Sequence, residues 1–272
     1  MNETIIIPLG TVAPYPKEDK NCPGFLIKYK DNNILLDCGN GSTRLLNMES
    51  DLNNLKIFIS HLHPDHYGDL ISLLQTIMVY KNYGYIKNDI ELYIPQTIVT
   101  EEESYKDKDG WACSRNIRTN IIDYKYIKKY ADKIGIKLKE LKDKININYD
   151  GINIDSTLVT HPVECYALKV VTENGIIVYS GDTGINNNLG KFAKNSDLFI
   201  CESTFLKGQY RSEDGHLYAH EAAMIAKCAN VKKLLLTHFW PEIDKQKYVD
   251  EAKVIFENTD YAVEGKKLIL RR

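Results

Sequence analysis

Short apolar blocks recur along the chain, and most of them end at a glycine, a proline or a polar residue. Apolar runs of this length, bounded by turn-forming residues, are typical of strands. Between several of them the polar residues Asn, Asp and Gly form short turns that favour hairpins. We predict strands at 4–9, 25–29, 34–37, 55–59, 90–94, 152–159, 166–171, 176–179, 198–200 and 233–236.

A longer segment after Asp69 has helical spacing instead. Its apolar positions recur every three or four residues, which predicts an amphipathic helix packed on a sheet. These positions are Leu70, Leu73, Leu74, Ile77 and Met78. Further helices are predicted at 42–48, 123–134 and 220–229, the second of them ending at Gly135.

Several predicted strands lead directly into a residue that can bind a metal ion. These residues are His61, His161, Asp182 and His238. Open α/β architectures place their sites at one rim of the strands, so we expect the four side chains to lie along one edge. The pattern therefore predicts an α/β protein with its chemistry at that edge.

The densest group of such side chains lies in the stretch Ser60-His61-Leu62-His63-Pro64-Asp65-His66, which contains 3 of the 7 histidines of the chain. Alternate residues of an extended chain share a face, so His61 and His63 point to one side. Asp65 and His66 open the following turn and reach a second point nearby. Imidazole and carboxylate groups bind Zn²⁺ and related ions, and this geometry fits two ions better than one. The alternative is that these are ordinary loop histidines at a helix start.

The composition fits one large domain spanning residues 1–272. The chain is 43% hydrophobic, and its formal net charge of −2 provides no global positive field for a long nucleic acid. Its six cysteines include no C-x-x-C pair, so we expect reduced, mostly buried thiols. The amino-terminal residues show neither a secretion signal nor a membrane span, so we expect a cytoplasmic protein without membrane contact.

The segment at about 97–148 is charged and rich in tyrosine, and we interpret it as an excursion inserted into the domain. Trp111, Arg115 and Arg118 are candidates for stacking on a base and binding phosphate. The alternative is a solvated surface segment whose tryptophan merely packs. Asp37 is also open to two interpretations, because it can support the metal histidines from behind or act as a turn-forming carboxylate.

The order of these residues resembles the metallo-β-lactamase-fold hydrolases along almost the whole chain. The family pattern His-x-His-x-Asp-His stands at 61–66, and the later ligands stand at His161, Asp182 and His238. The resemblance implies an αββα sandwich, a four-layer α/β fold, with two divalent ions, Zn²⁺ first and Mn²⁺ as the alternative. It assigns the first ion to His61, His63, His161 and Asp182. It assigns the second to Asp65, His66, Asp182 and His238.

Within that family, the segments Ser180–Thr183, Glu202–Phe205 and Leu236–Phe239 look like the ribonuclease Z branch of phosphodiesterases. An extra histidine, His216, precedes an alanine-rich helix and belongs to the same likeness. By this likeness His216 protonates the leaving oxygen, Asp65 holds or deprotonates the attacking water, and Glu202 lies among the substrate contacts. The alternative for His216 is a structural loop histidine.

One departure from that branch changes the expected substrate. Enzymes that trim tRNA precursors carry a long basic arm, commonly between the strand after the middle histidine and the Gly-Asp segment, whereas here a short hairpin joins Tyr166 to Ser180. We therefore expect a small phosphodiester, most of all a cyclic nucleotide, and the chain is similar to phage anti-Pycsar phosphodiesterases that counter immune signalling. The alternatives are a tRNA 3′ endonuclease, a lactonase or thioesterase, and a non-catalytic metal-binding protein.

The resemblance also bears on assembly, because hydrolases of this branch are commonly homodimers. We expect this chain to be a homodimer. We further expect the segment around Trp111–Arg118 to form a lid over its own or the partner's site.

Overall fold

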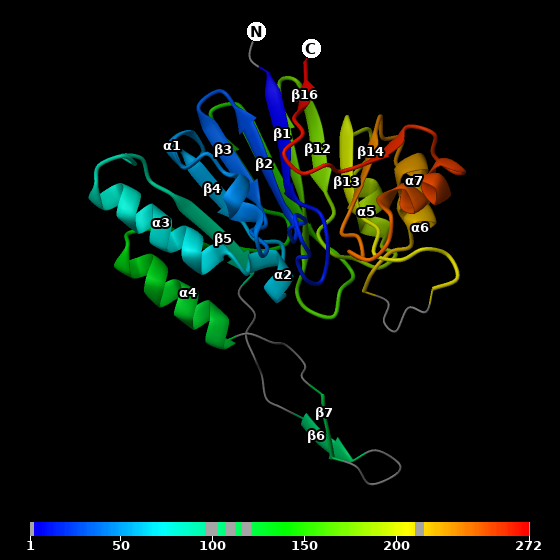
Figure 1. Ribbon diagram of the computed structural model, residues 1–272, viewed down its shortest axis with the longest axis horizontal. Coiled ribbons are helices and arrows are strands. Elements are labelled where there is room, and N and C mark those ends of the chain that lie inside the picture. The colour runs from blue at the N-terminus through cyan, green and yellow to red at the C-terminus, as the bar shows by residue number, and fades with distance from the viewer. Residues whose placement is uncertain (1–2, 96–102, 107–111, 116–120, 210–214, 272) are drawn as a thin grey trace.

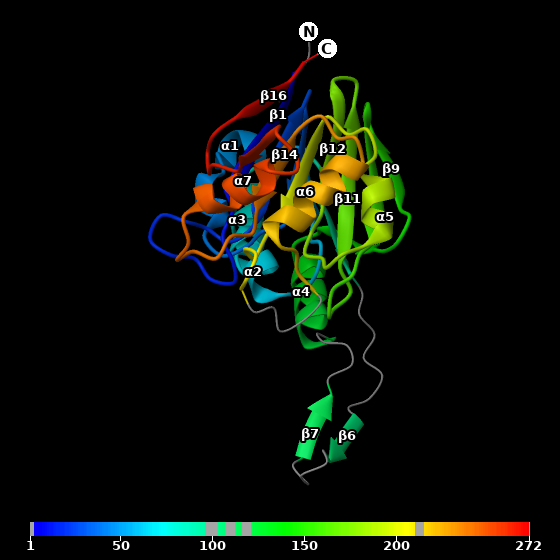
Figure 2. The same cartoon turned by 90° about the vertical axis from the view of Figure 1, so that its right-hand side faces the viewer.

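The computed structural model describes residues 3–95, 103–106, 112–115, 121–209 and 215–271. Its core is two sheets of seven strands each, with the orders β16-β1-β2-β3-β4-β5-β8 and β15-β14-β13-β12-β11-β10-β9. The sheets lie face to face, with α3 and α4 outside the first and α5, α6 and α7 outside the second (Figures 1 and 2). This confirms the predicted αββα sandwich.

The first sheet is formed by strands from the amino-terminal half together with the last strand of the chain. Its strands are β1 (Thr4–Gly10), β2 (Gly24–Tyr29), β3 (Asn32–Leu36), β4 (Leu55–Phe58), β5 (Glu91–Pro95), β8 (Lys137–Leu141) and β16 (Leu268–Leu270). The helices of this half are η1 (Ser42–Leu45), α1 (Met48–Asp51), α2 (Pro64–Tyr67), α3 (Leu70–Asn82) and α4 (Ile121–Lys133).

The second sheet comes from the carboxy-terminal half. Its strands are β9 (Asn146–Tyr149), β10 (Ile152–Leu158), β11 (Tyr166–Thr172), β12 (Gly175–Tyr179), β13 (Leu198–Glu202), β14 (Leu234–Thr237) and β15 (Thr259–Tyr261). The helices that cover it are α5 (Asn187–Phe192), α6 (Ala219–Cys228) and α7 (Lys245–Lys253). A separate two-stranded sheet, β6 (Glu103–Lys106) with β7 (Ala112–Arg115), projects away from the sandwich in both views.

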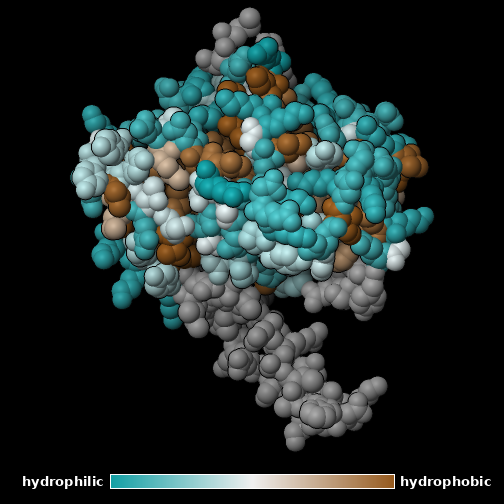
Figure 3. All heavy atoms as spheres, in the orientation of Figure 1, coloured by the Kyte–Doolittle hydropathy of each residue, from teal (hydrophilic) through white to brown (hydrophobic). Residues whose placement is uncertain are grey.

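The apolar side chains form three buried layers, as a four-layer sandwich requires. Along β2, Leu26 packs under α3, whereas its neighbours Phe25 and Ile27 face the other sheet. Strands buried on both faces read as continuous apolar runs, which explains the blocks in the sequence. The face shown in Figure 3 is mostly hydrophilic, with apolar residues in separate small groups. Among the residues that the structure describes, no helix is long and apolar enough to cross a bilayer.

Two predictions about elements are wrong. The segment 97–148 is not all an excursion, because β8 pairs with β5 and β9 pairs with β10, so its last part extends both sheets. These are edge strands whose exposed positions carry Lys, Glu and Asn, and this polarity hides their strand pattern. The helix predicted at 42–48 is instead a 3₁₀ turn, η1, followed by the separate helix α1.

The strand directions bring the candidate ligands to one edge of the sandwich. β3 and β4 are parallel, so both end at the same edge of the first sheet. β12, β13 and β14 are parallel to one another. β10 runs in the same direction, because β10 and β12 are both antiparallel to β11. We call the edge at which these strands end the site edge.

Gly181 enables a close approach of backbones at the site edge. Its φ is +58°, and a Cβ atom there would lie 3.0 Å from the Cys165 sulfur and 3.1 Å from the Tyr166 carbonyl oxygen. The residue before Asp182 therefore has neither the conformation nor the space that a side chain needs.

We predict that Gly181→Ala lowers the free energy of unfolding by about 2–4 kcal/mol, from the left-handed backbone and the overpacking together. Gly190→Ala in α5 is the matched control, because a Cβ atom at that residue would have nothing within 4 Å of it and alanine favours a helix. Urea unfolding of both variants measures the difference. Equal stability of the two variants would contradict the argument.

Candidate metal centre

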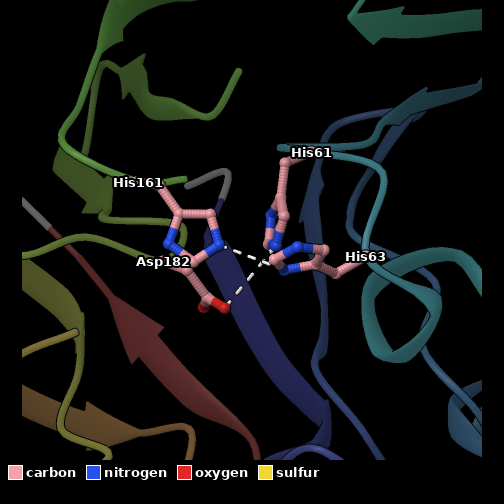
Figure 4. A group of neighbouring side chains, drawn as sticks. All are labelled: His61, His63, His161 and Asp182. Atoms are coloured by element: carbon pink, nitrogen blue, oxygen red, sulfur yellow. Dashed lines mark hydrogen bonds and ion pairs between the residues drawn. The ribbon is translucent and has the colours of Figure 1, made fainter. Parts of the chain in front are cut away.

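The site edge gathers two groups of metal-binding side chains. The ligand atoms of His61, His63, His161 and Asp182 lie within 4.8 Å of one another, and so do those of Asp65, His66 and His238. In Figure 4 the members of the first group point toward one another from three loops, which follow β4, β10 and β12. All seven predicted ligands are therefore brought together.

Asp182 lies between the two groups. Its Oδ2 atom is 3.6 Å from His61 Nε2, 3.2 Å from His66 Nε2 and 3.1 Å from His238 Nε2. One carboxylate that reaches both groups is the arrangement expected of a ligand shared by two ions.

The Nδ1 atoms of two histidines are fixed by groups behind the site. The Tyr179 hydroxyl donates to Asp37 Oδ2 at 2.6 Å, and the His66 Nδ1–H donates to the same oxygen at 2.7 Å. The Ser60 hydroxyl also donates to this oxygen, so it accepts from His61 Nδ1 at 3.0 Å. A carboxylate only accepts, so both rings carry their proton on Nδ1 and present Nε2 to the site. Asp37 therefore lies behind the histidines, one of the two positions we considered for it.

Two more histidines are oriented in the same way. His161 Nδ1–H donates to the Gly215 carbonyl oxygen at 2.8 Å. The Thr204 hydroxyl donates to Glu202 Oε2 at 2.9 Å, so it accepts from His238 Nδ1 at 2.8 Å. His63 differs, because its Nδ1 faces His161 Nε2 at 3.1 Å.

Burial and charge act on the two groups in opposite directions. Burial lowers the pKa of His61 well below its usual value and lowers the pKa of His161 to about 4. Burial also disfavours the charge on His238, but the carboxylates of Asp182, Asp65 and Glu202 together outweigh it and raise the pKa of His238 to about 10. The pKa of His63 is lowered as well, so the three imidazoles of the first group are neutral, the form that binds a metal ion.

The donor set fits divalent metal ions. His61 Nε2 and Asp182 Oδ1 are buried and have no hydrogen-bond partner. A buried polar atom without a hydrogen-bond partner destabilises the fold, and a cation bound by these atoms would relieve that cost. Five imidazoles and two carboxylates are also ligands that suit Zn²⁺.

His216 is held beside this centre by Glu202. Its Nδ1–H donates to Glu202 Oε1 at 2.9 Å, and its ring stacks on His238 with centroids 5.3 Å apart. Burial disfavours the imidazolium, but the carboxylates of Glu202 and Asp182 together outweigh it and raise the pKa of His216. His216 Nδ1 also lies 4.0 Å from Asp182 Oδ2, within a third group of possible ligands formed with His238.

The structure does not support the predicted substrate contact of Glu202. Its side chain is 1% exposed, and its oxygens accept from the backbone N–H groups of Thr183, Thr204 and Leu217 as well as from His216. Glu202 therefore orients other groups. Of the other predicted contacts, Trp111 and Arg118 lie outside the described residues, and Arg115 lies in β7, of which only the backbone is described.

Sequence reasoning missed Tyr179 and Thr204. Tyr179 ends an apolar strand and looks like a core residue, so its sequence context carries no sign of its contact with Asp37. Thr204 lies in the polar stretch after β13, next to a predicted site residue, and that position was a usable signal.

Comparisons with known proteins agree with this geometry. Residues 32–239 match the family model of the Beta-lactamase superfamily domain. Ribonuclease Z of Thermococcus sibiricus is 31% identical over 93% of this chain and 91% of its own length. The protein ML1173 of Mycobacterium leprae is 29% identical over 94% of this chain and 84% of its own. The metallo-beta-lactamase fold protein YhfI from Bacillus subtilis superposes with a TM-score of 0.81, at 22% identity, over 98% of this chain and 99% of its own.

We predict that Asp37→Asn weakens the affinity for Zn²⁺ by about 10–100-fold, because an amide cannot accept all the hydrogen bonds that hold His66 and Ser60. Competition with a chromophoric chelator measures this affinity. Asp51→Asn is the matched control, since Asp51 is also buried but pairs with Lys28 at 2.7 Å. Wild-type affinity in Asp37→Asn would contradict the proposed support.

Proposed function

The chain belongs to the β-lactamase superfamily, and on that premise we propose that it is a dinuclear metal-dependent phosphodiesterase that hydrolyses a small phosphodiester, most of all a cyclic nucleotide. The observation that carries this proposal is the pair of ligand groups that meet at Asp182, with a Glu202-held imidazole beside them. The family and the donor set support divalent metal binding. Two zinc ions are our proposal for their number and identity.

The residues would divide between the two ions as their contacts suggest. His61, His63 and His161 would hold one ion, Asp65, His66 and His238 would hold the other, and Asp182 would be shared. When bound, such a pair of ions polarises phosphoryl oxygens and lowers the pKa of a water molecule.

Two side chains of the site are proposed to act on protons. Asp65 is 6% exposed, and its Oδ2 lies 3.5 Å from His238 Nε2, so its carboxylate can orient a water molecule or accept its proton. His216 is proposed to protonate the departing ribose oxygen. The neighbouring Glu202 carboxylate favours the imidazolium form of His216, which carries the proton to be donated.

Several features favour a small substrate over tRNA. β11 and β12 pair through Thr172 and Gly175, which leaves only two residues at the turn where the tRNA-binding arm is commonly inserted. The alignment with the Thermococcus ribonuclease Z is 282 positions long, although it spans only 93% of the 272 residues of this chain. That relative therefore contains segments without a counterpart here, while the alignment with ML1173 needs only 258 positions for 94% of this chain.

The tRNA 3′ endonuclease stays the second candidate, because the ribonuclease Z relative matches nearly the whole chain. A thioesterase has less need of a positioned acid, since a thiolate departs more readily than an alkoxide. The Glu202–His216 pair therefore favours a phosphodiester over a thioester, whereas a lactone, which also expels an alkoxide, stays an alternative. Hydrolysis of 3′,5′-cyclic nucleotides and of a tRNA precursor, with and without chelator, separates these candidates. The predicted homodimer and lid stay predictions.

We predict that His63→Ala and Asp182→Ala each abolish hydrolysis of bis(p-nitrophenyl) phosphate and lower the bound zinc measured by mass spectrometry. Both variants should still unfold cooperatively, because these ligands lie at strand ends rather than in the packed layers. His220→Ala is the matched control, because His220 belongs to none of the ligand groups. Its Nδ1 atom lies 2.7 Å from Glu251 Oε1. Full activity in either ligand variant would refute the dinuclear assignment.

We predict that His216→Ala slows hydrolysis of ribose and alkyl phosphodiesters by about 10²–10⁴-fold, because an alkoxide leaves poorly without a proton. p-Nitrophenyl esters should lose much less, since p-nitrophenolate needs no proton to leave. Glu202→Gln should also slow hydrolysis of the ribose and alkyl esters more than that of the p-nitrophenyl esters, but by a smaller factor than His216→Ala. Steady-state rates on both ester classes measure the contrast, and equal losses on both would remove the acid role of His216.

A further inference from the structure

Two partly exposed aromatic residues, Tyr15 and Trp240, lie on the loop after β1 and on the turn after β14. Tyr15 is 40% exposed and Trp240 is 41% exposed, and their ring centroids are 6.4 Å apart at an angle of 77°. Trp240 follows the predicted ligand His238 by two residues, so their Cα atoms are at most about 7 Å apart. Trp240 is therefore exposed on the same turn that carries a predicted metal ligand.

The backbone around this pair is firmly held. The Phe239 N–H donates to the Thr11 carbonyl oxygen, and the Ala13 N–H donates to the Phe239 carbonyl oxygen, both at 2.9 Å. The Phe239 side chain is fully buried and lies 4.9 Å from the Tyr248 ring. The loop after β1 is thus joined to the turn after β14, and Phe239 rather than Trp240 anchors that turn in the core.

Further contacts hold the loop on the other side of the pair. The Tyr15 hydroxyl donates to Glu242 Oε1 at 3.3 Å, Lys17 pairs with the same carboxylate, and the Lys20 ammonium donates to the Pro241 carbonyl oxygen at 3.0 Å. The polar ends of Tyr15 and Lys17 are engaged by the protein, whereas the Tyr15 and Trp240 residues stay about two-fifths exposed.

We propose that Tyr15 and Trp240 form a nucleobase-binding subsite, on which the base of a nucleotide stacks while its phosphate lies at the metal centre. This inference rests on the proposed function and specifies its substrate as a nucleotide. An edge-to-face pair leaves ring faces available, and a planar base is the ligand that matches them. A single ribose separates the base from the phosphate, so the base must lie close to the ligand residues. Stacking accepts any base, so we expect little discrimination among bases from this pair.

Trp240 itself reports the binding. The chain has two tryptophans, so in a Trp111→Phe protein all tryptophan fluorescence comes from Trp240. In the zinc-loaded protein we expect AMP to quench this fluorescence and ribose 5-phosphate, which lacks a base, not to do so. Tyr15→Ala should weaken AMP binding by about 5- to 150-fold, the range for losing one stacked ring. Absence of quenching by AMP, or equal quenching by the two ligands, would overturn the subsite.

Kinetics give a second readout. The ratio of KM for 3′,5′-cyclic AMP to KM for 1-deoxyribose 3′,5′-cyclic phosphate, which has no base, should rise in Trp240→Ala by about 5- to 150-fold. Tyr83→Ala is the matched control, since Tyr83 is 74% exposed at the end of α3 and should leave the ratio unchanged.

Two outcomes separate this inference from the proposed function. An unchanged KM ratio in Trp240→Ala overturns the subsite, including when light scattering shows that the same variant has lost a dimer contact. This outcome includes an equal rise of both KM values, because the pair would then only support the metal centre. If the wild type hydrolyses neither ester, the proposed function fails, and the AMP titration still decides whether the subsite exists.

Discussion

Four imidazole rings meet at one buried region with their Nδ1 atoms already hydrogen-bonded, and the rest of the site edge depends on this constraint. Asp37, through Ser60 as well as directly, determines the orientation of His61 and His66, whereas Gly215 and Thr204 do the same for His161 and His238. Each ring therefore presents one defined nitrogen. Such rings need little reorganisation to bind a cation, and so the site is organised before any ligand arrives.

The fold provides the means for this orientation. Strands from both sheets end at the same edge, so groups far apart in the sequence become neighbours without long loops. Two residues at the centre, Asp37 and His238, have positive φ values of 60° and 63°. Non-glycine residues rarely adopt this conformation, and it occurs here at the carboxylate that holds two histidines from behind and at one of the imidazoles of the site. The packed layers on either side stabilise the fold enough to hold that strain.

The sequence was informative where periodicity and chemistry agreed. The apolar blocks predicted most of the sandwich strands, and the spacing after Asp69 predicted α3, because buried elements leave a regular apolar pattern. The seven ligand positions followed from a family pattern, and the structure brings these residues together. Edge strands β8 and β9 were missed, since half-exposed strands with polar residues lack that pattern. The role of Glu202 was also beyond sequence reasoning, because it depends on which donors surround a buried carboxylate.

The connection between β5 and β8 has a consequence for how such a protein changes over time. These strands are parallel neighbours in one sheet, and the chain that joins them contains residues 96–136. A crossover between adjacent strands can lengthen or shorten while the register of the sheet and the ligands on the other strands are retained. Evolution can therefore vary this connection as a replaceable module, so that relatives can acquire new recognition surfaces around an unchanged catalytic framework.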